Sequence, residues 1–120
     1  MFQGQSEHED ESIRAVQLYI KNHYQELKVE DLCERFAIPR RSLERRFKKA
    51  THNTPVEYIQ RVKIEAAKKD LESTGKSVSE IMYDVGYSDV KSFRNVFRRI
   101  TGLTPVAYRS KFGREGAVWV

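Results

Sequence analysis

Arginine and lysine side chains gather in two short stretches of this 120-residue sequence. Residues 40–49 carry six of them against the single acid Glu44, and residues 91–111 carry six with no acid at all. Guanidinium and ammonium groups bind polyanions, because they donate hydrogen bonds to phosphate oxygens and to the acceptor groups of guanine. The chemistry that these stretches could perform is therefore recognition of a negatively charged partner.

Each stretch contains a segment with the period of a helix, apolar on one side and polar on the other. The residues that predict the buried sides are Leu43, Phe47 and Ala50 in the first segment and Phe93, Phe97 and Ile100 in the second. The residues at the opposite angles are Arg41, Glu44, Arg45 and Lys48 in the first and Lys91, Arg94, Asn95 and Arg98 in the second. Arginine and lysine suit guanine, asparagine suits adenine, and a glutamate can accept from cytosine.

Position along each helix separates two roles. Residues near the N-terminus are expected to reach base edges, and those nearer the C-terminus are expected to reach phosphates. The predicted phosphate contacts are Lys48, Lys49, Arg98 and Arg99. A single basic helix face is more often merely solvated, so the duplication of the pattern carries the inference. Glu44 has two interpretations, a contact to cytosine or a salt bridge to a neighbouring cation.

The two basic segments belong to an internal repeat with a period of about 50 residues. Residues 42–58 align with residues 92–108, with seven identical positions. A shift of 49 aligns residues 29–36 with 78–85, so the single-residue difference between the copies falls in the turn before the basic helix. Each copy therefore has a short helix, a tight turn and a basic helix, which is the order of a helix-turn-helix.

A helix over residues 54–73 is predicted to join the copies. Thr54, Pro55 and Glu57 form an N-cap, a first-turn proline and a capping box, and Gly75 follows the end. At ~1.5 Å per residue it spans roughly 30 Å, close to the ~34 Å repeat of B-DNA. Its apolar residues form two separate stripes, Ile59, Val62 and Ala66 against Ile64, Ala67 and Leu71. Two stripes predict an early half packed in one body and a late half packed in another.

The chain is thus predicted to be all-α, with about seven helices. The expected organisation is a tail or linker over 1–10, a helix-turn-helix subdomain over 11–53, a linker helix over 54–73, a second subdomain over 74–112 and a tail over 113–120. Trp119 in that last segment is expected to belong to a frayed end. The predicted recognition helices are 39–51 and 89–101.

Composition excludes several other classes of protein. The net charge of +5 favours a polyanionic partner only weakly. Cys33 is the single cysteine, which excludes an internal disulfide and a cysteine zinc cluster. The three histidines show neither metal-ligand spacing nor a nucleophile partner, so we predict no enzyme, metal or cofactor. No apolar run approaches the ~20 residues of a membrane span.

The stretch YDVGYSDVKSFRNVFRRITGLTPVAYR (83–109) resembles the signature of the AraC/XylS family of bacterial transcription regulators. The resemblance covers roughly residues 12–112 and implies that family's C-terminal DNA-binding domain, with homeodomain-like subdomains in adjacent major grooves of double-stranded DNA. It also implies a cytoplasmic, nucleoid-associated protein, often an activator that meets RNA polymerase. The fragment is expected to be monomeric, and the longer protein to be able to dimerise. Residues 9–24 and 71–81 are similar to the branch with a glutamine-amidotransferase-like sensor domain.

Carried onto this sequence, the base-reading positions of the family fall on Arg40, Arg41, Glu44, Arg45, Lys91, Ser92, Arg94 and Asn95. Two positions depart from the family pattern. Lys28 stands where a capping serine or threonine is usual, so the helix after it is expected to start less firmly. Met82 stands where a small residue is usual, so the second copy is expected to pack its helices further apart. The alternative function is a protein- or RNA-docking helical module without sequence-specific DNA readout.

Overall fold

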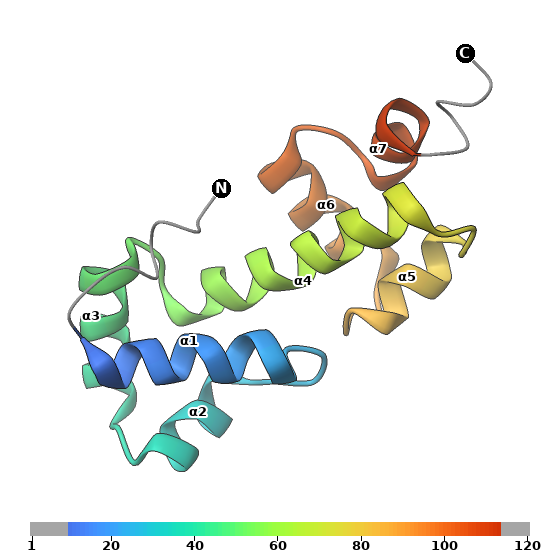
Figure 1. Ribbon diagram of the computed structural model, residues 1–120. Coiled ribbons are helices and arrows are strands. Elements are labelled where there is room, and N and C mark those ends of the chain that lie inside the picture. The colour runs from blue at the N-terminus through green and yellow to red at the C-terminus, as the bar shows by residue number, and fades with distance from the viewer. Residues whose placement is uncertain (1–9, 114–120) are drawn as a thin grey trace. The chain divides into compact units, whose positions relative to one another are not determined.

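A computed structural model describes residues 10–113, which form α-helices joined by short turns (Figure 1). The helices are α1 (Glu11–His23), α2 (Val29–Phe36), α3 (Arg40–Thr51), α4 (Pro55–Ser73), α5 (Val78–Asp84), α6 (Val90–Thr101) and α7 (Pro105–Phe112). The predicted all-α fold is confirmed, and α3 and α6 are the two predicted basic helices. The expectation for Trp119 lies outside the described residues. The chain divides into two compact units, which we call unit 1 and unit 2, and the boundary falls between Val62 and Lys63, inside α4.

Unit 1 builds its core from α1, α2, α3 and the first half of α4. Its buried side chains include Ile13, Val16, Ile20, Leu32, Leu43, Phe47, Tyr58, Ile59 and Val62. Phe47 meets Tyr58 edge to face, with ring centroids 5.2 Å apart, and the amide of Gln17 donates to the Tyr58 hydroxyl at 3.3 Å. These contacts fix the side of α3 that is turned inward, and therefore the side that is turned outward.

Unit 2 builds its core from the second half of α4 with α5, α6 and α7. Its buried side chains include Ile64, Ala67, Leu71, Ile81, Met82, Phe93, Phe97 and Tyr108. Phe97 meets Tyr108 edge to face at 5.5 Å, and the Tyr108 hydroxyl donates to the carboxylate of Glu72. Ile59 and Val62 of the first stripe predicted on α4 are thus buried in unit 1, and the second stripe is buried in unit 2. Ala66, predicted with the first stripe, lies in unit 2 and is only half-buried.

The turn of each helix-turn-helix has the same hydrogen bonds. In unit 1, Ala37 N–H donates to Glu34 O at 3.4 Å and Ile38 N–H donates to Cys33 O at 3.1 Å. In unit 2, 49 residues later, Gly86 N–H donates to Tyr83 O at 3.1 Å and Tyr87 N–H donates to Met82 O at 3.0 Å. This pair of bonds is a Schellman motif, which ends a helix with one left-handed residue. That residue is Ala37 at φ 52° in unit 1 and Gly86 at φ 100° in unit 2.

The far ends of α3 and α6 are also built alike. Thr51 Oγ1 lies 2.8 Å from Phe47 O and accepts from Asn53 N–H at 3.1 Å. Thr101 Oγ1 lies 2.9 Å from Phe97 O and accepts from Leu103 N–H at 3.1 Å. Each hydroxyl therefore closes its own helix and holds the start of the next segment, so the backbone repeats at a shift of 50 residues.

The helix starts follow the predicted caps with two differences. Thr54 and Glu57 exchange both bonds of a capping box, at 3.1 and 2.8 Å. Pro39, expected as the first residue of α3, is its N-cap instead. Lys28 has no side-chain acceptor, but Asp31 accepts from the Lys28 N–H at 2.9 Å. Half of a capping box therefore remains where a weaker start was expected.

Candidate nucleic-acid interface

The outer face of α3 is defined by the burial of its inner face. Leu43 and Phe47 are fully buried, which leaves Arg41 and Arg45 exposed on the opposite side, one turn apart. Neither guanidinium has an ion pair with the described residues 10–113. The two side chains therefore present donor groups to solvent, as their wheel angles predicted.

Arg40, at the first residue of α3, lies between two carboxylates. Its Nη1 is 2.6 Å from Glu30 Oε2 on α2, and its Nε is 3.2 Å from Glu44 Oε2 on α3. The hydrogen bond to Glu44 and the charge of Glu30 raise the pKa of Arg40 above its ordinary value. Of the two interpretations of Glu44, the salt bridge is present, and the contact to cytosine stays a prediction.

An open hollow lies on the outer face of α6. Its lining includes Lys91, Arg94, Asn95 and Arg98, together with Val90 and Thr104. Four residues predicted for base or phosphate contact are therefore brought together by the one-turn spacing of α6. The buried Phe93 and Phe97 hold the opposite face of α6 inward.

Ser92, also predicted to read a base, binds the N-cap residue at the start of α6. Its Oγ donates to Asp89 Oδ2 at 2.7 Å, and its N–H donates to the same oxygen at 2.9 Å. These bonds hold the pKa of Asp89 below its ordinary value, with the Ser92 hydroxyl as the main cause. Its negative charge also lies beside the positive N-terminal end of the helix dipole, where it is stabilising.

The predicted phosphate contacts lie in different surroundings. Lys48 Nζ donates to His52 O at 3.2 Å, at the C-terminal end of α3. Lys49 and Arg99 are exposed, and Arg98 lines the hollow of α6. Arg99 acts on the phenol of Tyr87, whose pKa is raised to about 12 by burial in spite of that cation.

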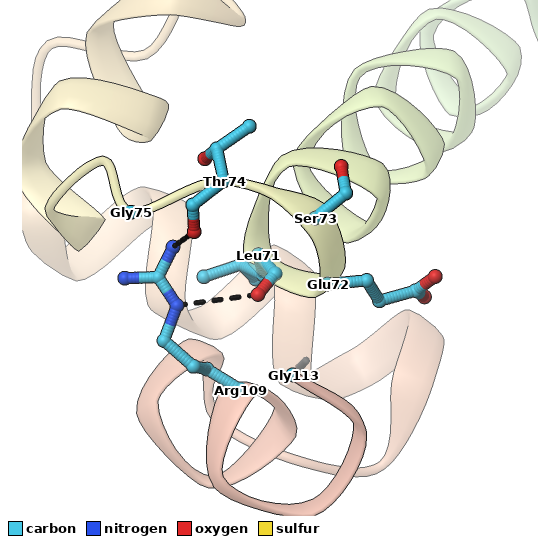
Figure 2. A pocket seen from close by; sticks show the side chains of 7 residues that line it. All are labelled: Leu71, Glu72, Ser73, Thr74, Gly75, Arg109 and Gly113. Carbon is cyan, nitrogen blue, oxygen red and sulfur yellow. Dashed lines mark hydrogen bonds between the residues drawn. The ribbon is translucent and has the colours of Figure 1, made fainter. Parts of the chain in front are cut away.

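Arg109, part of the second basic stretch, makes its hydrogen bonds within unit 2. Figure 2 shows its guanidinium directed at the last turn of α4, where Nε donates to Leu71 O at 3.2 Å and Nη2 donates to Thr74 O at 3.1 Å. The last turn of α4 contains no cation of its own, so Arg109 binds the carbonyl groups left unpaired there. The hollow beside it, of about 120 Å³, is smaller than the ~300 Å³ of small-molecule sites.

Two residues on these faces were missed by the sequence reasoning. Glu30 was not connected with α3, because a contact between residues ten apart on different helices leaves no periodic signal. Val90 was not considered, although its position one turn before Arg94 could have shown it, since an outward apolar residue breaks the charged pattern of α6.

Other kinds of site find no support in the described part of the chain. No group of three or more His, Cys, Asp or Glu side chains there could hold a metal ion. None of the described helices combines the length and apolar character that crossing a membrane needs. Cys33 is half-buried against the core of unit 1, which suits a small packing residue.

The fold and the two cationic faces define a duplicated helix-turn-helix protein. A family profile described as a helix-turn-helix domain matches residues 32–111. The chain belongs to this family, the AraC-type helix-turn-helix domains.

Curated relatives of the chain are named as transcriptional activators. One is the activator RhaS of Pectobacterium carotovorum, 32% identical over 95% of this chain and 42% of the relative. Another is the activator RhaR of Mannheimia succiniciproducens, 35% identical over 73% of this chain and 32% of the relative. The chain therefore spans less than half the length of either relative.

Solved structures share the fold. The C-terminal domain of AraT, a response regulator from Geobacillus stearothermophilus, superposes with a TM-score of 0.82 at 24% identity, covering 87% of this chain and 88% of that one. The DNA-binding domain of AdpA, solved in complex with a target DNA, gives a TM-score of 0.76 at 28% identity, covering 87% and 94%. The first of these likenesses concerns the fold alone.

Proposed function

We propose that this chain is the DNA-binding part of a transcription regulator, which places α3 and α6 in adjacent major-groove segments of double-stranded DNA. The observation that carries the proposal is a duplicated helix-turn-helix whose second helix has a cationic outer face in both copies. The AdpA domain, which has the same fold and was solved with a target DNA bound, supports this role. In this proposal residues 11–53 and 74–112 are the two subdomains and 54–73 is the linker helix.

Each outward side chain receives a role from its hydrogen-bonding groups. Arg41, Arg45 and Arg94 would each present a two-pronged donor to guanine, and Asn95 would pair with adenine. Lys91 and Arg40 would donate to guanine, Glu44 would accept from cytosine, and Ser92 suits either kind of base. The cations nearer the helix ends would bind phosphates, namely Lys48, Lys49, Arg98 and Arg99.

The length of α4 supports a site of two groove segments. Its 19 residues correspond to roughly 28 Å at ~1.5 Å per residue. One turn of B-DNA is about 34 Å, so a single continuous helix is of the length needed to join two readers. A preferred site of roughly two helical turns follows.

The wider biology is proposed from the family and the names of the relatives. Relatives named as activators support contact with RNA polymerase by the longer protein. We infer a role that needs no catalysis, metal or cofactor, carried out on the nucleoid in the cytoplasm. The fragment itself would be monomeric, with dimerisation left to the part outside these residues, in the branch with a glutamine-amidotransferase-like sensor.

Docking to RNA is the alternative that the side chains disfavour. Single-stranded RNA readers stack bases on exposed aromatic rings. The aromatic residues of α3 and α6 are instead buried, since Phe47, Phe93 and Phe97 are at most 1% exposed. A single-stranded RNA competitor should therefore displace duplex DNA poorly.

The test is selection of preferred duplexes from a random library, followed by titration of Arg45→Ala on the preferred duplex and on random DNA. A two-pronged contact from Arg45 to guanine is worth about 1–3 kcal/mol of discrimination, so the variant should lose about fivefold or more in affinity on the preferred duplex and little on random DNA. Lys49→Ala is the matched control, because loss of a phosphate contact weakens both duplexes equally. Wild-type protein that prefers no duplex over random DNA would refute the proposal.

A further inference from the structure

Val90 is an apolar residue on a face that is otherwise polar and charged. Its side chain is 56% exposed, although it is the first residue of α6 and lines the same hollow as Lys91, Arg94 and Asn95. Helix formation does not explain it, since β-branched residues are weaker helix formers than alanine or the long polar residues. Val90 therefore leaves apolar surface open to a ligand of unit 2, beside the cations that line the same hollow.

The place of Val90 in α6 is set by the cap before it. Asp89 binds both the N–H and the hydroxyl of Ser92, at 2.9 and 2.7 Å, which fixes the first turn of the helix. In helix-turn-helix proteins the N-terminal residues of the second helix are the ones that contact base edges. Arg94 lies four residues further on, about 6 Å along the axis, which is less than two base steps of about 3.4 Å.

Among the base edges in the major groove, the C5-methyl group of thymine is the apolar one. We propose that Val90 is a specificity residue that covers a thymine methyl group, within two base pairs of the guanine bound by Arg94. The inference rests on the proposed function, because it names one base of the duplex that α6 would read. Unit 2 would then recognise its half of the DNA site through an apolar contact as well as through hydrogen bonds.

Unit 1 supplies an internal contrast. The residue 50 positions earlier is Arg40, whose guanidinium is held by Glu30 and Glu44 at 2.6 and 3.2 Å. A guanidinium group donates hydrogen bonds, and a methyl group cannot accept one. Methyl dependence should therefore appear in the half-site of α6 and be absent from the position of α3 that corresponds to Val90.

The experiment replaces each thymine of the selected duplex, one at a time, by deoxyuridine, which lacks only the methyl group. Substitution of one thymine in the half-site of unit 2 should lower the affinity of the wild-type protein about fourfold. Burial of a methylene-sized group contributes about 0.8 kcal/mol, and a difference of 1.4 kcal/mol corresponds to tenfold in affinity. Val90→Ala should bind the thymine and uracil duplexes with affinities within about 1.5-fold of each other. The matched control is Val106→Ala, which removes a valine of α7 that is 66% exposed and should keep the fourfold difference.

The outcomes separate this inference from the proposed function. A wild-type protein that selects a duplex but tolerates uracil at every thymine overturns the role of Val90 and leaves DNA recognition intact. A Val90→Ala protein that keeps the full uracil penalty overturns it equally. Failure to select any duplex refutes the proposed function instead. Circular dichroism of the variant confirms that the helices of unit 2 are retained, as expected for an exposed first-turn position.

Discussion

The outer faces of α3 and α6 differ in how their charges are balanced. On α3 the first cation, Arg40, is shared between Glu30 and Glu44, so two carboxylates stand among the arginines. The hollow of α6 has its one carboxylate, Asp89, at the helix cap, and valine occupies the place of Arg40. Any phosphate that approaches α3 meets charges of both signs, whereas one that approaches α6 beyond its cap meets cations.

The backbone beneath these faces is almost the same in the two units. The turn motif, the threonine that closes the second helix and the edge-to-face aromatic pair each occur twice, at shifts of 49 or 50 residues. The outward side chains of the two helices differ in charge, as Glu44 and Arg94 at matching positions show. The comparison teaches that the two units share a frame and differ in the chemistry they present.

We expect the largest effect on stability from replacing the buried phenylalanine at the centre of each unit. Phe47 and Phe97 are both fully buried, so Phe47→Ala and Phe97→Ala should each lower the free energy of unfolding by about 3–5 kcal/mol. Because their surroundings are duplicated, the two losses should agree within about 1 kcal/mol. Urea denaturation followed by circular dichroism measures them.

Resolved amide signals from nuclear magnetic resonance show which unit each variant affects. Phe47→Ala should broaden or shift signals of α1, α2 and α3 most, and Phe97→Ala those of α5, α6 and α7. Val106→Ala serves as the surface control, with an expected change within about 0.5 kcal/mol. Losses that differ by more than about 2 kcal/mol would show that the frames are not energetically equivalent.

A smaller effect is expected from the carboxylate that distinguishes the faces. Glu30→Gln removes one partner of Arg40 and one negative charge beside the proposed DNA-binding face of α3, so affinity for duplex DNA should rise by about two- to fivefold at low salt. The rise should shrink as salt is added, because exposed charges are screened. The pair is exposed, so folding stability should change by less than about 1 kcal/mol. Fluorescence anisotropy with labelled DNA measures the binding.

The matched change in unit 2 is Ser79→Glu, since Ser79 occupies the place of Glu30 at a shift of 49 residues. It adds a carboxylate to α5 where Val90 takes the place of the arginine partner, and it should weaken binding by a similar factor. If Glu30→Gln leaves binding unchanged at every salt concentration, the mixed charge of the α3 face has no role in affinity.

Local features of this fold were predictable from the sequence because they depend on neighbouring residues. The period of Leu43 and Phe47 gave the inward side of α3, and the spacing of Thr54 and Glu57 gave a capping box that the structure contains. The two stripes of α4 gave its division between units. Each of these signals needs only the geometry of one helix.

Contacts between elements were beyond the same reasoning. Arg109 was counted among the six cations of residues 91–111 with no further role, but it caps the end of α4, 35 residues away from Thr74 in the sequence. Arg46 was likewise only counted among the six cations of residues 40–49, and it binds Asp10 with two hydrogen bonds, at 3.0 and 3.2 Å. Long cationic side chains can reach several elements, and the choice among them depends on packing that no periodicity records.

The smallest expected effect, that of Ala37→Gly, concerns the left-handed residue in each turn, where the two units use different amino acids. A side chain at positive φ costs roughly 1–2 kcal/mol, and glycine loses about 0.5–1 kcal/mol more chain entropy on folding than alanine does. Ala37→Gly at φ 52° should therefore stabilise the protein by about 0.5 kcal/mol, because Ala37 is exposed and gives up little packing. Gly86→Ala should destabilise it by about 1 kcal/mol after the same subtraction, because φ 100° lies further than φ 52° from the left-handed value of about 57°. Thermal unfolding should show shifts of opposite sign, and a loss of stability in both variants would mean that the turn of unit 1 depends on the methyl group of Ala37 rather than tolerating it.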